Sequence, residues 1–151
     1  MPRKFVFRLE SMLGLRRAFE EKKRNELALA QREVHETMNA LLEMFQLEAR
    51  EKDEARHHKQ GAINIVTLRL QEAFLNHLTR RMSAQQEKIN QARAKELKAR
   101  AEYIEARKNV RLLERLKERK LRNWQYETSR EETRNLDEVA SYRHQSREEQ
   151  P

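Results

Sequence analysis

The side chains that most often do chemistry in proteins are present in this sequence, but few of them are brought together by their spacing. Histidine occurs at five positions: His35, His57, His58, His77 and His144. The adjacent pair, His57 and His58, would point to different sides of a helix and so would not ligate one metal ion. The chain has no cysteine, no ordered Ser/His/Asp spacing, and only two glycines, too few for a glycine-rich phosphate loop. We therefore predict a protein that is not an enzyme, with no catalytic residue, cofactor, metal or small-molecule ligand.

Basic side chains are the functional groups that do gather in the sequence. Residues 107–122 hold eight basic and two acidic side chains, in a chain of net charge +8. One interpretation is a solvated helix face, with Glu114 and Glu118 in weak i,i+4 ion pairs. A second is docking on an acidic protein surface. A third is nucleic-acid binding, which needs more aromatic residues than Tyr103, Trp124 and Tyr126, or a known module. The basic side chains are Arg107, Lys108, Arg111, Arg115, Lys117, Arg119, Lys120 and Arg122.

The composition favours helices over other architectures. Charged residues make up 38% of the chain and hydrophobic residues 37%, and no proline lies between residues 3 and 150. These features exclude a turn-rich β protein. No apolar run approaches the roughly 20 residues of a transmembrane helix, and the first residues lack the apolar run of a signal peptide. The absence of cysteine suits the cytoplasm.

Residues 75–124 form the most regular stretch of the sequence. A series of mostly apolar side chains recurs there in steps of three and four over about seven heptads, which is typical of a coiled-coil helix. This spacing predicts a long helix from about residue 67 to about residue 142. Such a helix needs a partner, because a lone amphipathic helix is not stable in water. The series is Leu75, Leu78, Met82, Gln85, Ile89, Ala92, Glu96, Ala99, Tyr103, Ala106, Val110, Leu113, Lys117, Lys120 and Trp124.

A shorter heptad series, from Leu27 to Phe45, supplies the partner and predicts a first helix over about residues 9–58. Gly61 can end this helix, and Asn64 or Thr67 can cap the next one, so we expect a turn at about residues 59–66. The two helices would then fold back on each other. We predict that residues 1–151 form a single elongated antiparallel two-helix coiled-coil hairpin with a frayed C-terminal tail.

The seam of the long helix is irregular near its end. Lys117 and Lys120 occupy seam positions of the series, and lysines there weaken a two-helix seam. The stretch from Leu116 to Leu121 therefore indicates either a shift of register, where a third partner can bind, or fraying.

Two apolar clusters lie outside the regular seam. At the start of the chain, Phe5, Phe7 and Leu9 alternate with other residues, and they either cap one end of the rod or face a partner. Near the turn, folding at Gly61 brings four large apolar residues to similar heights. These form either a broader core or an exposed apolar patch for a partner. They are Leu42, Phe45, Phe74 and Leu78.

Two motifs together resemble the flagellar FliJ family over nearly the whole chain. The first is the opening Lys-Phe-Val-Phe-Arg-Leu-Glu of residues 4–10, followed by Leu13 and Arg16. The second is Leu-Glu-Arg-Leu-Lys-Glu-Arg-Lys of residues 113–120, followed by Tyr126, Glu131 or Glu132, and Leu-Asp-Glu-Val-Ala of residues 136–140. The injectisome counterparts of this family usually lack the opening Phe-x-Phe-Arg-Leu-Glu.

The resemblance implies a soluble component of the flagellar type III export apparatus, similar in fold to the central stalk of rotary ATPases. Members of the family insert into the export ATPase ring, contact the cytoplasmic domain of the export gate and recycle export chaperones. These partners imply a cytoplasmic protein associated peripherally with the inner face of the cell membrane at the flagellar base. The implied ATPase-docking residues are Arg8, Arg16, Arg115, Lys117, Arg119 and Lys120. The implied gate contacts are Leu42, Phe45, Phe74 and Leu78.

Two other functions remain compatible with the residues. The chain could be a structural coiled-coil scaffold that homodimerises through its long helix, or a basic helical protein that binds nucleic acid with strong salt dependence. Our main interpretation has no nucleic-acid partner and a monomeric hairpin when the protein is free.

Overall fold

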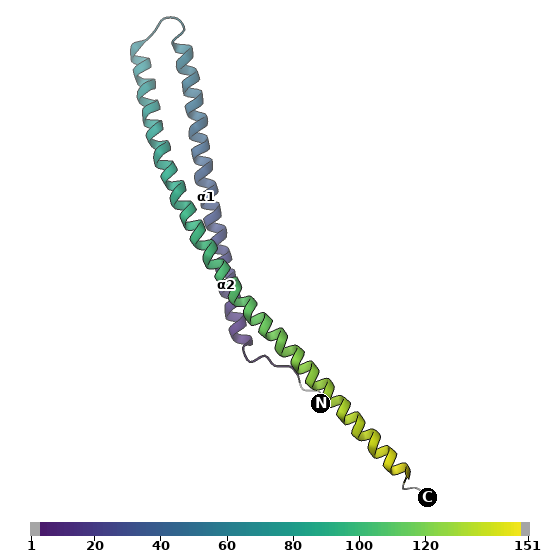
Figure 1. The fold of residues 1–151 in the computed structure, drawn as a ribbon. Coiled ribbons are helices and arrows are strands. Elements are labelled where there is room, and N and C mark those ends of the chain that lie inside the picture. The colour runs from purple at the N-terminus through teal and green to yellow at the C-terminus, as the bar shows by residue number, and fades with distance from the viewer. Residues whose placement is uncertain (1–3, 149–151) are drawn as a thin grey trace. The chain divides into compact units, whose positions relative to one another are not determined.

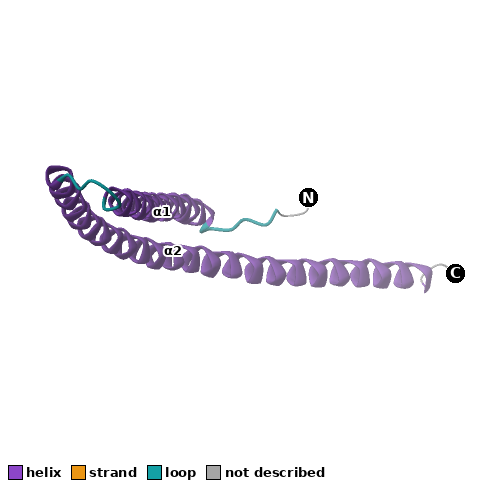
Figure 2. Cartoon of the chain, turned by 90° about the horizontal axis from the view of Figure 1, so that it is seen from above, coloured by secondary structure: helices purple, strands orange, loops and turns teal. Residues whose placement is uncertain are grey.

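The computed structural model describes residues 4–148 and contains two long helices joined by a short turn (Figure 1). Helix α1 comprises Glu10–His58 and helix α2 comprises Ile65–Glu148. In Figure 2 the loops of the described chain are the turn and the segment that precedes α1. The predicted fold class, an all-α antiparallel coiled-coil hairpin, is confirmed. Among residues 4–148, no helical stretch has the length and apolar character needed to cross a membrane.

The turn forms because both helix ends find local hydrogen-bond partners. The backbone N–H of Gln60 donates to the carbonyl of His57 at 3.1 Å, and Gly61 follows with φ +118°, a left-handed conformation that glycine adopts without strain. Asn64 then caps α2. Its side-chain Oδ1 accepts from the N–H of Val66 and its carbonyl accepts from the N–H of Leu68, both at 3.1 Å. Of the two expected caps, the structure uses Asn64.

The bounds of α2 differ from the sequence-based expectation at both ends. Because Asn64 is the cap, the helix begins at Ile65 and takes the β-branched residues Ile65 and Val66 into its first turn. At the other end the helix continues past Tyr142 to Glu148, since no glycine or proline interrupts this charged stretch. The last part of the expected frayed tail, residues 149–151, lies outside the described residues.

The chain divides into two compact units, each with its own packing. The hairpin unit, Glu20–Glu105, contains the turn and the helical stretches on either side of it. Its seam buries Leu78, Ile89 and Ala92 of α2 almost completely. Half-buried residues of α1, including Leu27, Val34 and Leu41, lie in the same seam. Two ion pairs cross between the helices: Lys23 Nζ lies 3.0 Å from a Glu102 carboxylate oxygen, and Lys95 Nζ lies 3.1 Å from Glu33.

Gln85 is a polar residue buried in this mostly apolar seam. Gln85 is 7% exposed, and its Nε2 donates a 2.9 Å hydrogen bond to the backbone carbonyl of Thr37. The Thr37 hydroxyl is already satisfied, because it donates within α1 to the carbonyls of Glu33 and Val34. A buried amide at a seam position favours one register of the coiled coil but contributes less stability than an apolar side chain.

We therefore expect Gln85→Leu to raise the free energy of unfolding by about 1–2 kcal/mol, as buried apolar surface replaces one net hydrogen bond. Urea unfolding followed by circular dichroism measures this change. Gln86→Leu is the matched control, because its exposed side chain should shift the free energy by less than about 0.5 kcal/mol. A loss of stability in Gln85→Leu would mean that the bond to Thr37 outweighs the apolar gain.

The terminal unit comprises residues 4–19 and 106–148. Its core contains Phe7 from the loop before α1, Leu13 from α1 and Val110 from α2, with exposed fractions of 6%, 0% and 4%. The partly buried side chains of Phe5, Leu113 and Leu116 pack against these three residues. Phe5 and Phe7 therefore pack as the capping role requires, whereas Leu9, the third residue of that prediction, is 37% exposed and lies outside this core.

Near the end of the seam, one residue of the predicted heptad series, Lys120, was assigned wrongly. Lys117 is half-buried, as expected for a seam position, but Lys120 is exposed and Leu121 is half-buried in its place. The seam steps by four residues from Lys117 to Leu121 and then by three to Trp124, because this spacing keeps apolar side chains on the packed face. Only one of the two lysines therefore lies in the seam.

Candidate partner-binding surfaces

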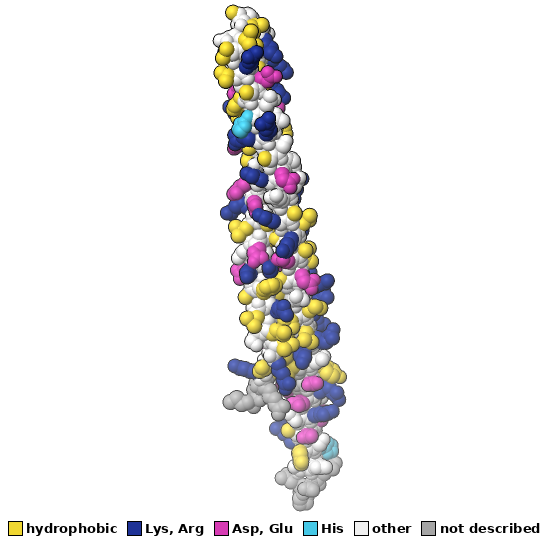
Figure 3. Space-filling model, turned by 90° about the vertical axis from the view of Figure 1, so that its left-hand side faces the viewer, with side chains coloured by type: hydrophobic (Ala, Val, Ile, Leu, Met, Phe, Trp, Pro, Cys, Tyr) yellow, Lys and Arg dark blue, Asp and Glu magenta, His cyan; other side chains and the backbone are white. Residues whose placement is uncertain are grey.

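The basic residues predicted to dock the ATPase are all in the terminal unit. Arg115, Arg119 and Lys120 are exposed on α2, and within residues 4–148 none of the three forms a salt bridge. We call these three residues the basic surface. Arg115 and Arg119 are one helical turn apart and line a shallow surface depression together with Glu118, Arg122 and Asn123. Figure 3 shows one face of the molecule, on which basic, acidic and hydrophobic side chains are intermixed.

Lys117 differs from the other predicted docking residues because it is held inside the unit. Its Nζ lies 2.8 Å and 3.0 Å from the two carboxylate oxygens of Glu10, at the start of α1. A second pair, Arg17 with Glu114 at 3.2 Å, crosses between the same two helices. Sequence reasoning missed both pairs. Counting outward from Gly61 places Glu10 and Lys117 at comparable heights but sets Arg17 and Glu114 more than two helical turns apart, so only the first pair could have been found in this way. Lys117 is therefore engaged in a partly exposed ion pair between α1 and α2, unlike the three residues of the basic surface.

Arg8 and Arg16 also belong to the terminal unit, and both side chains are exposed. Arg8 precedes α1 in the loop segment, and Arg16 lies in the second turn of α1. No hydrogen bond or ion pair joins either arginine to the basic surface within the described chain. The structure thus places the predicted docking residues in one unit, with Lys117 paired and the others exposed.

The four residues predicted to contact the gate separate into three environments. Leu42 and Phe45 are 55% and 50% exposed, and both line a groove of the hairpin unit. Phe74 is 40% exposed but does not line this groove. Leu78 is 1% exposed and belongs to the seam. Only Leu42 and Phe45 are therefore brought together on one accessible surface.

The groove around Leu42 and Phe45 is built by both helices. Met38 and Leu41 of α1 and Ile89 of α2 provide apolar walls, and Arg93 lies at the rim, with its guanidinium 3.9 Å from the Met38 sulfur. Sequence reasoning missed Met38 and Arg93. Met38 follows the apolar spacing of Leu42 and Phe45, so the signal was present in the sequence, whereas Arg93 could be assigned only once the register of the helices was known.

A cluster of charged residues ties the helices at the other end of the hairpin unit. The Lys23 ammonium donates to the carboxylates of Glu26 and Glu102 at 2.9 Å and 3.0 Å. These hydrogen bonds raise the pKa of Lys23, and the ammonium lowers the pKa of Glu102. The guanidinium of Arg24 lies 6.0 Å from the centre of the Tyr103 ring. Because these charged groups pair with one another across the two helices, we interpret the cluster as a structural contact between α1 and α2.

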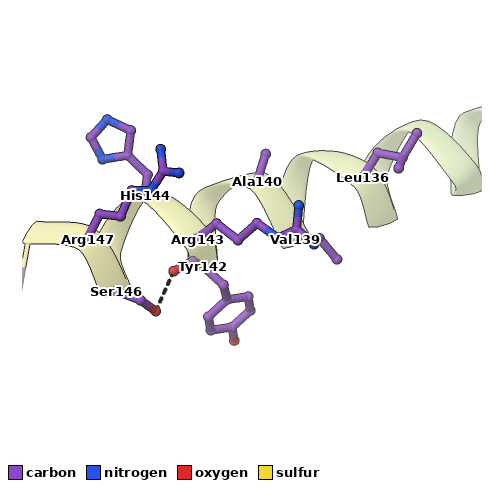
Figure 4. A pocket seen from close by; sticks show the side chains of 8 residues that line it. All are labelled: Leu136, Val139, Ala140, Tyr142, Arg143, His144, Ser146 and Arg147. Atoms are coloured by element: carbon purple, nitrogen blue, oxygen red, sulfur yellow. Dashed lines mark hydrogen bonds between the residues drawn. The ribbon is translucent and has the colours of Figure 1, made fainter.

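The last part of α2 presents a surface made by one helix alone. Leu136, Val139 and Tyr142 are 69%, 50% and 71% exposed, and Arg143 and Arg147 follow them (Figure 4). The Ser146 hydroxyl donates to the Tyr142 carbonyl at 2.8 Å, an ordinary bond of a serine to its own helix.

Among the described residues, no group of three or more His, Cys, Asp or Glu side chains is placed to hold a metal ion.

Comparison with known proteins gives one family and one solved fold. A family model described as "Flagellar FliJ protein" matches residues 5–149. The structure of CT670 from Chlamydia trachomatis, described as a YscO homologue, is similar in fold, with a TM-score of 0.55. The two chains are 17% identical, and the match covers 98% of this chain and 100% of the other. No curated protein sequence matches the chain.

Proposed function

Because the chain belongs to the flagellar FliJ family and is thus a component of a flagellar type III export system, we propose that it docks on the export ATPase ring through its terminal unit. The observation that carries this proposal is the grouping of exposed, unpaired basic side chains in that unit. Arg115, Arg119 and Lys120 form the basic surface. Arg8 and Arg16 are also exposed, and they lie close in sequence to Phe7 and Leu13 of the packed core. Unpaired arginines suit recognition of carboxylates on a partner.

The second part of the proposal concerns the export gate. The groove that contains Leu42 and Phe45 would bind the cytoplasmic domain of the gate, and Phe74 would add a separate apolar contact. Two half-exposed large apolar side chains beside a third, Met38, are a typical anchor for a protein partner. Leu78 would support this surface from the seam, where it is buried. The protein would then couple the ATPase to the gate with different parts of its chain.

The remaining parts of the proposal follow from the family. The protein would be a non-catalytic monomer when free, would escort export chaperones, and would act in the cytoplasm at the inner face of the membrane. It would use neither nucleic acid nor a small-molecule ligand.

The test is the ATP hydrolysis rate of the purified cognate export ATPase with and without this protein. We expect stimulation together with co-elution of the two proteins. Light scattering on the free protein should give the mass of a monomer. The absence of both stimulation and co-elution would contradict the proposal. A stable dimer in that case would favour the scaffold function, and salt-dependent binding to duplex DNA or RNA would favour the nucleic-acid function.

A further inference from the structure

The first turns of α1 are intrinsically weak. Leu9 occupies the N-cap position, since its carbonyl accepts the 2.8 Å bond from the N–H of Leu13, and a leucine side chain cannot cap the free N–H groups. Gly14 lies in the second turn, where glycine disfavours the helix relative to alanine, and nothing lies within 4 Å of the position that a Cβ would take. Neither the cap nor the propensity of these residues explains why the helix starts at Glu10.

Contacts with α2 supply the missing stabilisation. The extended segment before α1 alternates its side chains, so that Phe5 and Phe7 face the packed side while Val6 is 77% exposed. Phe7 is buried with Leu13 and Val110. The Phe5 ring lies 6.0 Å from the Trp124 ring at a tilt of 53°, and Glu10 holds Lys117. The contacts on α2 therefore extend from Val110 to Trp124.

We propose that residues 5–10 form a clasp, whose closing orders the start of α1 and the part of α2 that carries the basic surface. Arg115, Arg119 and Lys120 all lie between Val110 and Trp124, the two outer contacts of the clasp. When the clasp opens, this stretch of α2 loses its partner, and a lone helix is marginal in water. The closed clasp would present the basic surface on a rigid helix, and the open clasp would not.

The clasp is separable from the rest of the chain. The hairpin unit has its own buried seam and its own ties between the helices, none of which involves residues 5–10. Opening should therefore be a local event with the hairpin unit still paired, as is typical of cooperative sub-regions in proteins. Only the use of the basic surface rests on the proposed function; the ordering itself does not.

Hydrogen exchange followed by mass spectrometry on the full chain tests the clasp. In Phe7→Ala, amides of residues 10–19 and 106–124 should exchange faster by about two orders of magnitude, while residues 20–105 keep their wild-type protection. Val6→Ala is the matched control, since it alters the same segment at an exposed side chain and should leave all rates unchanged. Adding Gly14→Ala to Phe7→Ala should restore part of the protection of α1, because alanine strengthens the weak turn.

Two exchange results would overturn the clasp: wild-type protection of residues 106–124 in Phe7→Ala, or an equal loss throughout residues 20–105. The ATPase assay adds a separate arm. There Phe7→Ala should need about tenfold more protein for half-maximal stimulation, while Val6→Ala should match the wild type. Unchanged stimulation by a Phe7→Ala protein that has lost protection would contradict the link between order and docking. Absence of stimulation by the wild type would count against the proposed function, and the exchange result would still decide the clasp.

Discussion

Leu78→Ala is expected to lower the free energy of unfolding by about 2–5 kcal/mol, the range for a leucine removed from a well-packed core. The physical reason is its burial: Leu78 is 1% exposed in the seam of the hairpin unit. Leu42→Ala, at a side chain that is 55% exposed, should change the same free energy by less than about 1 kcal/mol. Urea unfolding monitored by circular dichroism measures both values.

These two variants, together with Phe45→Ala, distinguish a buried core residue from a partner-contacting residue in binding to the gate. Leu42→Ala and Phe45→Ala should weaken binding of the purified cytoplasmic domain of the gate while the protein stays folded, because each removes an accessible anchor of the groove. Leu78→Ala should weaken binding only to the extent that the hairpin unit unfolds, so lower temperature should restore it. If Leu78→Ala were as stable as the wild type and yet bound poorly, Leu78 would have to reach the partner directly, against its burial here.

The second large effect concerns charge. Reversing Arg115, Arg119 and Lys120 to glutamate should weaken association with the export ATPase by at least about 100-fold, because like charges at an interface cost several kcal/mol. Lys117 is left unchanged, since its reversal would place two carboxylates together at Glu10 and disturb the fold itself. Association measured at several salt concentrations should show a steep dependence for the wild type and a shallow one for the variant.

A control with the same change of charge comes from the hairpin unit. Arg50, Lys59 and Arg69 are exposed near the turn, and none forms a salt bridge within the described chain. Their reversal should alter the net charge equally but leave ATPase association nearly intact. Equal loss in both triple variants would show that the overall charge, not the basic surface, governs association.

The fold could be predicted from the sequence because its signals are periodic and strong. The long, mostly apolar series from Leu75 to Trp124 required a partner helix, and Gly61 with Asn64 marked the place of the turn. The register was harder to predict, since it depends on which side chains meet across the seam. The seam position after Lys117 is such a case: the spacing predicted Lys120, but Leu121 occupies the seam. Both residues follow allowed three- and four-residue spacings, and only packing decides between them.

The candidate sites were less predictable for the same reason. Phe74 and Leu78 are both large apolar residues near the turn, but their burial depends on which face of α2 meets α1. Leu78 is buried in the seam, whereas Phe74 is 40% exposed. Similarly, the sequence places Lys117 in a basic run, whereas the structure shows that it forms an ion pair with Glu10. Residue type identified the candidate surfaces, whereas their accessible members emerged only from the paired helices.

The antiparallel pairing also sets an order of folding. In the hairpin unit the residues joined by hydrogen bonds are 48 positions apart at Thr37 and Gln85 and 79 apart at Lys23 and Glu102. In the terminal unit Glu10 and Lys117 are 107 apart. Because the entropy lost on closing a loop grows with its length, pairing should begin beside the turn and proceed away from it. A nascent chain cannot join Glu10 to Lys117 until residue 117 has left the ribosome, so the terminal unit would be assembled last during synthesis.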